Sequence, residues 1–252
     1  MTVLSDKEQV RYSRQLMLAH VGFEGQQRLK QSRVLIVGVG GLGSPVALYL
    51  AAAGVGHLSL VDDDKVDLSN LQRQILYKIN HLGQGKVSAA AKTLTSVNNQ
   101  ITITSVSERL SEQNAHSLIG DHDVVLDCSD NFNTRYLVNR VCVAAHIPLI
   151  SGAAIANKGQ LICVDNRQSD QVGGCYQCVF PPSDAETALN CSNAGVFGPL
   201  LGVIGSMQAQ QCLNYLLGHA FSNCFIAFDA LNFQQSRFDF KQDPACKICN
   251  KK

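Results

Sequence analysis

Short apolar runs alternate with segments of helical periodicity over the first half of the chain. Five runs predict buried strands, at 33–37, 57–61, 101–106, 123–127 and 147–151. Helices are predicted at about 43–53, 86–97, 111–119 and 131–145, the third with Ser111 as its N-cap. Strands that alternate with helices are typical of an α/β fold with a Rossmann-like, doubly wound and mostly parallel sheet.

The two ends of the chain follow other patterns. Ser5 and Glu8 form a capping-box signature, which predicts a helix as far as about Leu18, and a second short helix is predicted at 25–31. Further strands are predicted at 159–165, 224–229 and 235–240, and we expect them to continue the sheet in antiparallel fashion. The segment 170–193 is rich in Gly, Pro, Ser and Cys, so it predicts a loop.

The apolar stretch at 194–207 is interrupted by glycines and falls short of the roughly 20 residues that span a bilayer. It therefore predicts a buried or subunit-interface helix, over about 195–217. The formal net charge of +1 argues for neither a nucleic-acid nor a membrane partner. The polar N-terminus lacks the apolar core of a signal peptide, so we expect a cytoplasmic protein.

A glycine-rich turn follows the first predicted strand. Gly38, Gly40 and Gly43 match G-x-G-x-x-G, and the motif opens a helix, which is the context that it requires. Glycines let the backbone approach a phosphate closely, and the helix N-terminus offers free N–H groups. Asp62 ends the second strand, where a carboxylate can accept hydrogen bonds from ribose hydroxyls. The turn predicts an adenine nucleotide, without deciding between a dinucleotide and ATP.

The charged residues that follow favour ATP. Arg73 and Lys86 could neutralise a triphosphate as pyrophosphate leaves. Asp130 and Asn131 lie just beyond the strand 123–127, at the edge where open α/β sheets bind ligands, and a carboxylate there could hold Mg²⁺. The alternative is that these are solvated loop charges. No G-x-x-x-x-G-K-[ST] occurs, so an ATP enzyme of this sequence is not a P-loop enzyme.

Two C-x-x-C pairs, Cys175/Cys178 and Cys246/Cys249, can together complete a tetrahedral Cys₄ zinc site. Such a site is closed and structural; redox and disulfide interpretations are the alternatives. Cys191 lies in the predicted loop and is a candidate nucleophile or a loop cysteine without a role.

Together these motifs resemble the bacterial ubiquitin-activating-like adenylyltransferases (MoeB/ThiF/HesA type) that activate sulfur carriers. The resemblance covers nearly the whole chain. It rests on RYSRQ at 11–15, GVGGLGS at 38–44, AGVG at 53–56, DLSNLQRQ at 67–74, DCSDN at 127–131, SGAA at 151–154, CYQC at 175–178, the segment around Cys191, and CKIC at 246–249. Two branches stay open: DDD at 62–64 leans towards the thiamine branch, and SGAAI at 151–155 towards the molybdopterin branch.

The resemblance implies a role for each matching residue. Nucleotide contacts are implied for Gly38, Gly40, Gly41, Leu42, Gly43, Asp62, Asp64, Ser69, Asn70, Leu71, Gln72, Arg73, Lys86, Asp130 and Asn131. Arg14 would reach the ATP of the partner subunit in a homodimer, and Asp130 would bind Mg²⁺. Cys191 aligns with a cysteine implicated in a covalent link to the activated carrier, and Cys175, Cys178, Cys246 and Cys249 would bind zinc.

The implied reaction is adenylylation of the C-terminal Gly-Gly carboxylate of a ubiquitin-like sulfur-carrier protein by ATP. An acyl-adenylate and pyrophosphate result, and we expect a separate sulfur donor, a cysteine desulfurase or a rhodanese-type protein. We expect one domain with N-terminal helices (1–32), a nucleotide-binding part (33–152) and a part for carrier, zinc and dimer contacts (153–252). The competing hypotheses are an NAD- or FAD-dependent oxidoreductase and a non-catalytic, zinc-stapled binding protein.

Overall fold

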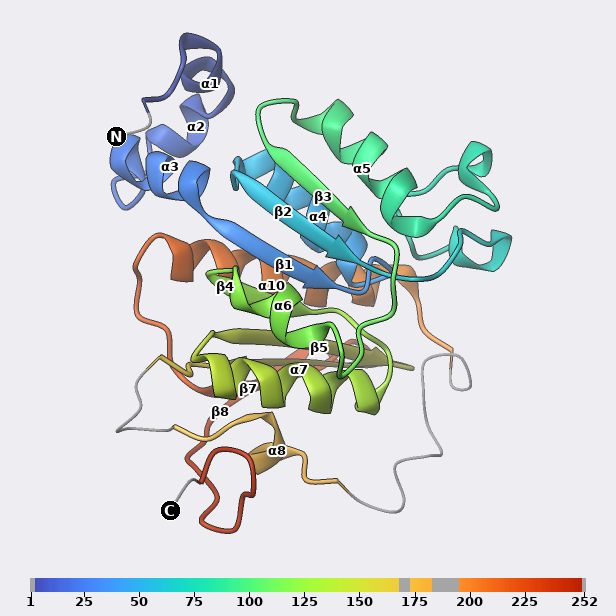
Figure 1. Ribbon diagram of the computed structural model, residues 1–252, viewed down its shortest axis with the longest axis vertical. Coiled ribbons are helices and arrows are strands. Elements are labelled where there is room, and N and C mark those ends of the chain that lie inside the picture. The colour runs from blue at the N-terminus through green and yellow to red at the C-terminus, as the bar shows by residue number, and fades with distance from the viewer. Residues whose placement is uncertain (1–2, 168–172, 183–194, 251–252) are drawn as a thin grey trace.

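One eight-stranded sheet organises the protein in the computed structural model, which describes residues 3–167, 173–182 and 195–250 (Figure 1). The strand order is β3-β2-β1-β4-β5-β6-β7-β8. The neighbours in the run β3-β2-β1-β4-β5 pair in parallel. The neighbours in the run β5-β6-β7-β8 pair in antiparallel fashion. The strands are β1 Arg33–Val37, β2 His57–Val61, β3 Thr102–Val106, β4 Val124–Asp127, β5 Leu149–Ile155, β6 Lys158–Val164, β7 Cys224–Asp229 and β8 Gln234–Asp239. The expected mixed, doubly wound sheet is confirmed.

Helices cover both faces of the sheet, which explains why its central strands are apolar at successive positions. Side chains alternate along β1: Val34 and Ile36 join the core cluster under α4, α5 and α10. Leu35 and Val37 join the opposite cluster, under α6 and α7. These helices are α4 Gly43–Ala53, α5 Lys86–Val97, α6 Ala115–Gly120, α7 Phe132–Ala145 and α10 Gly198–Leu216.

Several helix and strand ends differ from the sequence predictions. The first predicted helix is divided at Tyr12 into α1 Asp6–Arg11 and α2 Ser13–Leu16, and α3 Gly22–Gln31 begins earlier than expected. Ser111 is not an N-cap: its amide donates to Asn114 Oδ1 at 2.8 Å, and α6 begins only at Ala115. Strand β5 extends to Ile155 because it pairs with β6 across a two-residue turn.

The cysteine-rich loop and the apolar stretch after it are partly described. Within the predicted loop, residues 176–179 form the short helix α8 (Tyr176–Val179). Helix α10 buries Leu200, Leu201 and Ile204 in the core, as expected of a buried helix. No helix in the described part of the chain is long and apolar enough to cross a membrane.

Candidate functional site

A cleft opens where β1, β2 and β4 end and α4 begins. The chain proceeds from β1 outward through β2 and β3, then returns to add β4 and β5 on the other side. Such a topological switch point is where open α/β sheets bind ligands. Ten of the predicted nucleotide residues line the cleft: Gly38, Gly40, Gly41, Leu42, Asp62, Asp64, Arg73, Lys86, Asp130 and Asn131.

The glycine turn is held by contacts that leave no room for side chains. A Cβ on Gly38, whose φ is +86°, would lie 2.9 Å from the carbonyl oxygen of Cys128. A Cβ on Gly43 would lie 2.1 Å from the carbonyl oxygen of Gly38. The Val39 amide donates to Asp62 Oδ2 at 2.7 Å, and the Tyr77 hydroxyl donates to the Val39 carbonyl at 2.7 Å. The turn is therefore fixed before any ligand arrives.

Asp62 and Lys86 bring opposite charges to the same wall of the cleft. Burial raises the pKa of Asp62, although Lys86 and the hydrogen bonds from Val39 and Asp64 act to lower it. The Lys86 amine is buried, and Nζ lies 2.8 Å from Oδ2 of the exposed Asp64. An incoming anion can exchange with the Asp64 carboxylate at this amine, because Asp64 can turn to water.

The opposite wall comes from the end of β4 and the start of α7. Asn131 is the N-cap of α7, and its Oδ1 accepts from the Thr134 amide at 2.9 Å. Asp130, one residue earlier, is exposed at the cleft. Beneath it, both oxygens of the buried Asp127 accept serine hydroxyls at 2.6 Å, from Ser129 and Ser151. These bonds fix the loop that carries Asp130.

The sequence analysis missed several polar residues of the cleft, among them Gln74, Arg109 and Arg135. Arg109 follows the carboxyl end of β3, so the rule that found Asp130 could also have found it. Gln74 ends the DLSNLQRQ run and is 4% exposed. Arg135 is buried and its guanidinium donates to Ser151 Oγ at 3.3 Å. No pattern in the sequence signals that these two side chains turn inward.

Other predicted residues lie outside the lining of the cleft. Gly43 packs on Gly38 behind the turn. Ser69, Asn70, Leu71 and Gln72 belong to the 3₁₀ helix Leu68–Asn70 and the turn after it, where Asp67 Oδ1 accepts from the Ser69 amide at 2.8 Å. Arg14 is exposed on α2. Cys191 lies outside the described residues.

The four predicted zinc cysteines converge, although the two pairs are distant in sequence. The C-terminal segment lies beside α8 (Figure 1), and all four sulfurs lie within 4.8 Å of one another. Cys175 Sγ is 3.7 Å from Cys246 Sγ, and Cys178 Sγ is 3.4 Å from Cys249 Sγ. Tetrahedral zinc with Zn–S distances of about 2.3 Å would hold its sulfurs about 3.8 Å apart. The cluster therefore has the donors and the dimensions of a closed metal site.

Polar hydrogens surround these sulfurs. Interaction with the Cys175 thiol, and hydrogen bonds from the Asp243 and Cys175 amides to Cys178 Sγ at 3.4 Å, lower the pKa of Cys178 against the effect of burial. Asn139 Nδ2 lies 3.5 Å from Cys175 Sγ, and its Oδ1 accepts from the Tyr176 amide at 2.9 Å. Such outer contacts orient thiolate ligands and stabilise their charge.

Comparison with known proteins agrees with this geometry. The sequence model described as the ThiF family matches residues 12–248. Over 251 residues, the chain is 44% identical to the molybdopterin-synthase adenylyltransferase of Escherichia coli (strain K12), with 99% of each chain covered. It is 45% identical to the adenylyltransferase and sulfurtransferase MOCS3 of Xenopus laevis, covering 98% of this chain and 55% of that protein. The chain thus spans about half of that second relative.

Solved structures share the fold. The crystal structure of PaaA superposes with a TM-score of 0.81 at 26% identity, covering 96% of this chain and 76% of that chain. Escherichia coli MccB with ATP gives a TM-score of 0.81 at 22% identity, covering 96% of this chain and 75% of that chain. The sequence matches go further than the fold, because they extend over nearly the whole chain at more than 40% identity. The chain therefore belongs to the ThiF family.

Proposed function

We propose that this protein uses ATP to adenylylate the C-terminal Gly-Gly carboxylate of a ubiquitin-like sulfur-carrier protein in molybdopterin biosynthesis. The observation that carries the proposal is the cleft, where a fixed glycine turn, Asp62, Arg73, Lys86 and Asp130 meet. The 44%-identical relative named molybdopterin-synthase adenylyltransferase supports both the activity and the choice of this branch over the thiamine branch. An NAD- or FAD-dependent oxidoreductase would leave Arg73 and Lys86 without a task.

Different residues of the cleft contact different parts of the nucleotide. Asp62 accepts the ribose hydroxyls, and the backbone of Gly40 and Gly41 lies against the phosphates. Arg73 and Lys86 neutralise the phosphate charge, the latter by exchanging Asp64 for the nucleotide. Asp130 offers an exposed carboxylate of the kind that Mg²⁺ prefers, and the bound ion would add a positive charge at the phosphates.

The carrier's carboxylate attacks the α-phosphorus and pyrophosphate leaves, so a phosphoanhydride bond breaks as the acyl–phosphate bond forms. A terminal carboxylate has a pKa of roughly 3.3–3.7 and is ionised near neutral pH, so no residue of the chain needs to act as a base. The chain contributes by orienting the two reactants and by holding cations where charge develops on the leaving group.

The remaining parts of the proposal concern metal, partners and organisation. We assign Zn²⁺ to the four-cysteine cluster, because its sulfurs match a tetrahedral site. Arg14 acts at the cleft of the partner in a homodimer. Cys191 forms the covalent link to the activated carrier: its thiolate displaces AMP from the acyl-adenylate to give a thioester, and a separate protein donates the sulfur. Residues 33–152 bind the nucleotide, and 153–252 serve the carrier, zinc and dimer contacts.

Carrier-dependent exchange of labelled pyrophosphate into ATP tests this proposal. Purified protein is assayed with a molybdopterin-type and a thiamine-type carrier, each with an intact Gly-Gly end. We expect exchange with the first, and its loss when the carrier's last glycine is deleted. Exchange with neither carrier, together with tight NADH binding, would show that the cleft serves a dinucleotide instead.

Lys86→Ala gives the matching test on the enzyme. We expect exchange to fall at least 100-fold, as for other residues that stabilise transition-state charge. Lys92→Ala is the control, because Lys92 lies on the same helix but contacts Gln84 outside the cleft. Equal losses in the two variants would refute the assigned role of Lys86.

A further inference from the structure

Arg14 is held at the far end of α4 from the cleft of its own chain. Helix α4 begins at Gly43 beside the cleft and ends at Ala53, and its 11 residues span roughly 16 Å at about 1.5 Å per residue. The sequence neighbours of Arg14 contact the Ala53 end. Arg14 itself is exposed and does not line the cleft.

We infer that Tyr12 and Gln15 are positioning residues, which anchor the turn between α1 and α2 so that Arg14 is presented outward to the cleft of a partner subunit. This inference rests on the proposed function, in which Arg14 acts in the partner. It adds the residues that orient the arginine, and it predicts that their substitution lowers activity at the cleft of the other chain.

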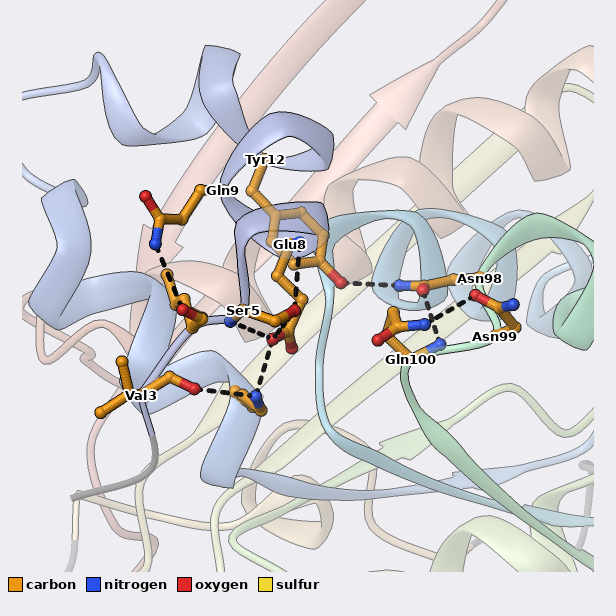
Figure 2. A network of polar contacts seen from close by, with 10 residues as sticks. Val3, Ser5, Glu8, Gln9, Tyr12, Asn98, Asn99 and Gln100 are labelled. Carbon is orange, nitrogen blue, oxygen red and sulfur yellow. Dashed lines mark hydrogen bonds and ion pairs between the residues drawn. The ribbon is translucent and has the colours of Figure 1, made fainter.

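Tyr12 is the first half of this anchor. Its ring is 3% exposed, and its hydroxyl accepts from Nδ2 of the fully buried Asn98 at 2.8 Å (Figure 2). The same Nδ2 donates to the Ala51 carbonyl at 2.7 Å, near the end of α4. Asn98 Oδ1 accepts from the Gln100 amide at 3.0 Å, so the amide is held on both sides. Tyr12 is thereby joined to the ends of both α4 and α5.

The Tyr12 ring packs closely against Gly54, where no other residue would leave room for it. Gly54 ends α4 with a φ of +84°, and a Cβ there would lie 2.5 Å from the ring. Glycine at this position both ends the helix and admits the ring. Tyr12 is also the residue at which the first predicted helix divides into α1 and α2. The break in the helix therefore coincides with the contact to the end of α4.

Gln15 is the second half of the anchor. Its Nε2 donates to the Ala53 carbonyl at 3.0 Å and to Gln26 Oε1 at 2.7 Å. Gln26 is fully buried on α3, and its own Nε2 donates to the Ala53 carbonyl at 2.9 Å. One terminal carbonyl of α4 thus accepts from two glutamines. These contacts satisfy a helix-end group that has no partner within the helix.

Residues 12 and 15 are anchored on either side of Arg14, so the arginine is left on the outer surface of α2. Arg11 adds a further tie, since Nη1 donates to the Val97 carbonyl at the end of α5 at 2.8 Å. Both halves of the anchor attach to helix ends and neither attaches to the cleft. A weakened anchor should therefore misplace Arg14 and leave the cleft of the same chain intact.

Mixed dimers separate these two effects. Two differently tagged chains are co-expressed, the heterodimer is purified through both tags, and pyrophosphate exchange is measured. One chain carries an anchor variant, Tyr12→Phe or Gln15→Leu. The other chain of the heterodimer carries Lys86→Ala or, in a separate experiment, Arg14→Ala. Gln9→Leu is the control, because Gln9 lies on α1 and its side chain donates to the Leu4 carbonyl, away from α4.

We expect each anchor variant alone to lose exchange by roughly 10-fold to 100-fold, the cost of a misplaced catalytic group. Paired with Lys86→Ala, it should recover about half of the wild-type rate, because one of the two sites of a symmetric dimer then has all its parts. Paired with Arg14→Ala, it should recover nothing, since neither site receives a well-placed arginine. Gln9→Leu alone should keep the wild-type rate.

The reverse pattern would overturn the inference: recovery with Arg14→Ala but not with Lys86→Ala means that the anchor serves the cleft of its own chain. Wild-type exchange in both Tyr12→Phe and Gln15→Leu would also overturn it. A heterodimer of one Arg14→Ala chain and one Lys86→Ala chain tests separately whether Arg14 acts in the partner subunit. If this heterodimer does not recover exchange, Arg14 has no role in the partner, and the anchor has no role in placing it there. Wild-type protein without exchange would reject the proposed function itself.

Discussion

At the scale of single residues, Gln74 carries one of the four buried side-chain polar atoms that lack a hydrogen-bond partner among the described residues. It is 4% exposed at the cleft, and Oε1 accepts no hydrogen bond from the described residues. Its Nε2 would lie 3.4 Å from a Cβ built on Gly40, which places the amide against the glycine turn. A buried polar atom without a partner costs about 1–3 kcal/mol, so retaining one at a ligand site favours a role in binding.

Gln74→Leu should therefore have opposite effects on the stability of the free protein and on its affinity for ATP. Leucine of similar size removes the unpaired amide, so we expect the melting temperature of the free protein to stay or rise. We expect ATP affinity to fall roughly 2-fold to 10-fold, the worth of about 0.5–1.5 kcal/mol for a hydrogen bond that Oε1 accepts from a neutral donor of the nucleotide, such as a ribose hydroxyl. Calorimetric titration with ATP and thermal melts measure the two effects.

Gln84→Leu is the control for this experiment. Gln84 contacts the Asn80 carbonyl at 2.8 Å and does not line the cleft. Unchanged ATP affinity in Gln74→Leu would mean that the orphan amide has no part in nucleotide binding.

The contrast between Asp62 and Gln74 shows what a sequence can reveal about a site. Asp62 follows from its place at the end of a strand after a glycine turn, because the motif itself dictates that geometry. Gln74 and Arg135 turn inward only because of how the 3₁₀ segment and α7 pack on the sheet. That packing leaves no periodic mark on the chain.

At the scale of elements, the ends of β1, α4, β2 and α5 agree with the sequence predictions, because local signals set them. Gly54 ends α4, for example, in the left-handed conformation that glycine adopts readily. The break at Tyr12 has no such local signal, and the side chain there contacts Asn98, far away in the chain. The extension of β5 likewise depends on β6, which follows it.

Helix α1 should be the element most sensitive to acid. Burial acts to raise the pKa of Glu8, but the ion pair with Lys30 at 2.8 Å and the hydrogen bonds from Ser5 outweigh it. Figure 2 shows Ser5 beside the Glu8 carboxylate. The pKa therefore lies below its ordinary value of 4.5. A lowered carboxyl pKa stabilises the fold above about pH 4.5, and this contribution is lost as the pH falls through the folded-state pKa.

We expect amide-exchange protection of Asp6–Arg11, corrected for the intrinsic effect of pH, to fall below pH 4.5 before that of the sheet. Glu8→Gln is the matched control, because glutamine can keep the capping box but cannot ionise. Its α1 should be less protected at neutral pH and show no such acid step. An identical acid step in Glu8→Gln would assign the effect to another group.

At the scale of the whole molecule, the sheet changes from parallel to antiparallel strand pairing at β5. The parallel strands β1, β2 and β4 end at the cleft, and the antiparallel strands β6 to β8 continue the sheet away from it. The cysteine cluster then joins α8 to the C-terminal segment on the face covered by α7. The cleft and the four-cysteine cluster are therefore built on one sheet but share no lining residue.

This separation predicts what metal removal does. Cys246→Ser removes one of the four thiolates to which we assign Zn²⁺, so we expect zinc binding to be lost together with several degrees of melting temperature. ATP affinity should stay within about twofold, because additivity of distant sites predicts little coupling to the cleft. Zinc content by elemental analysis, thermal melts and ATP titration measure the three quantities. Cys212→Ala, buried in α10 outside the cluster, is the control: it should lower stability without loss of zinc. A Cys246→Ser protein that keeps its zinc, or that loses ATP binding together with it, would contradict the division of the molecule into two independent sites.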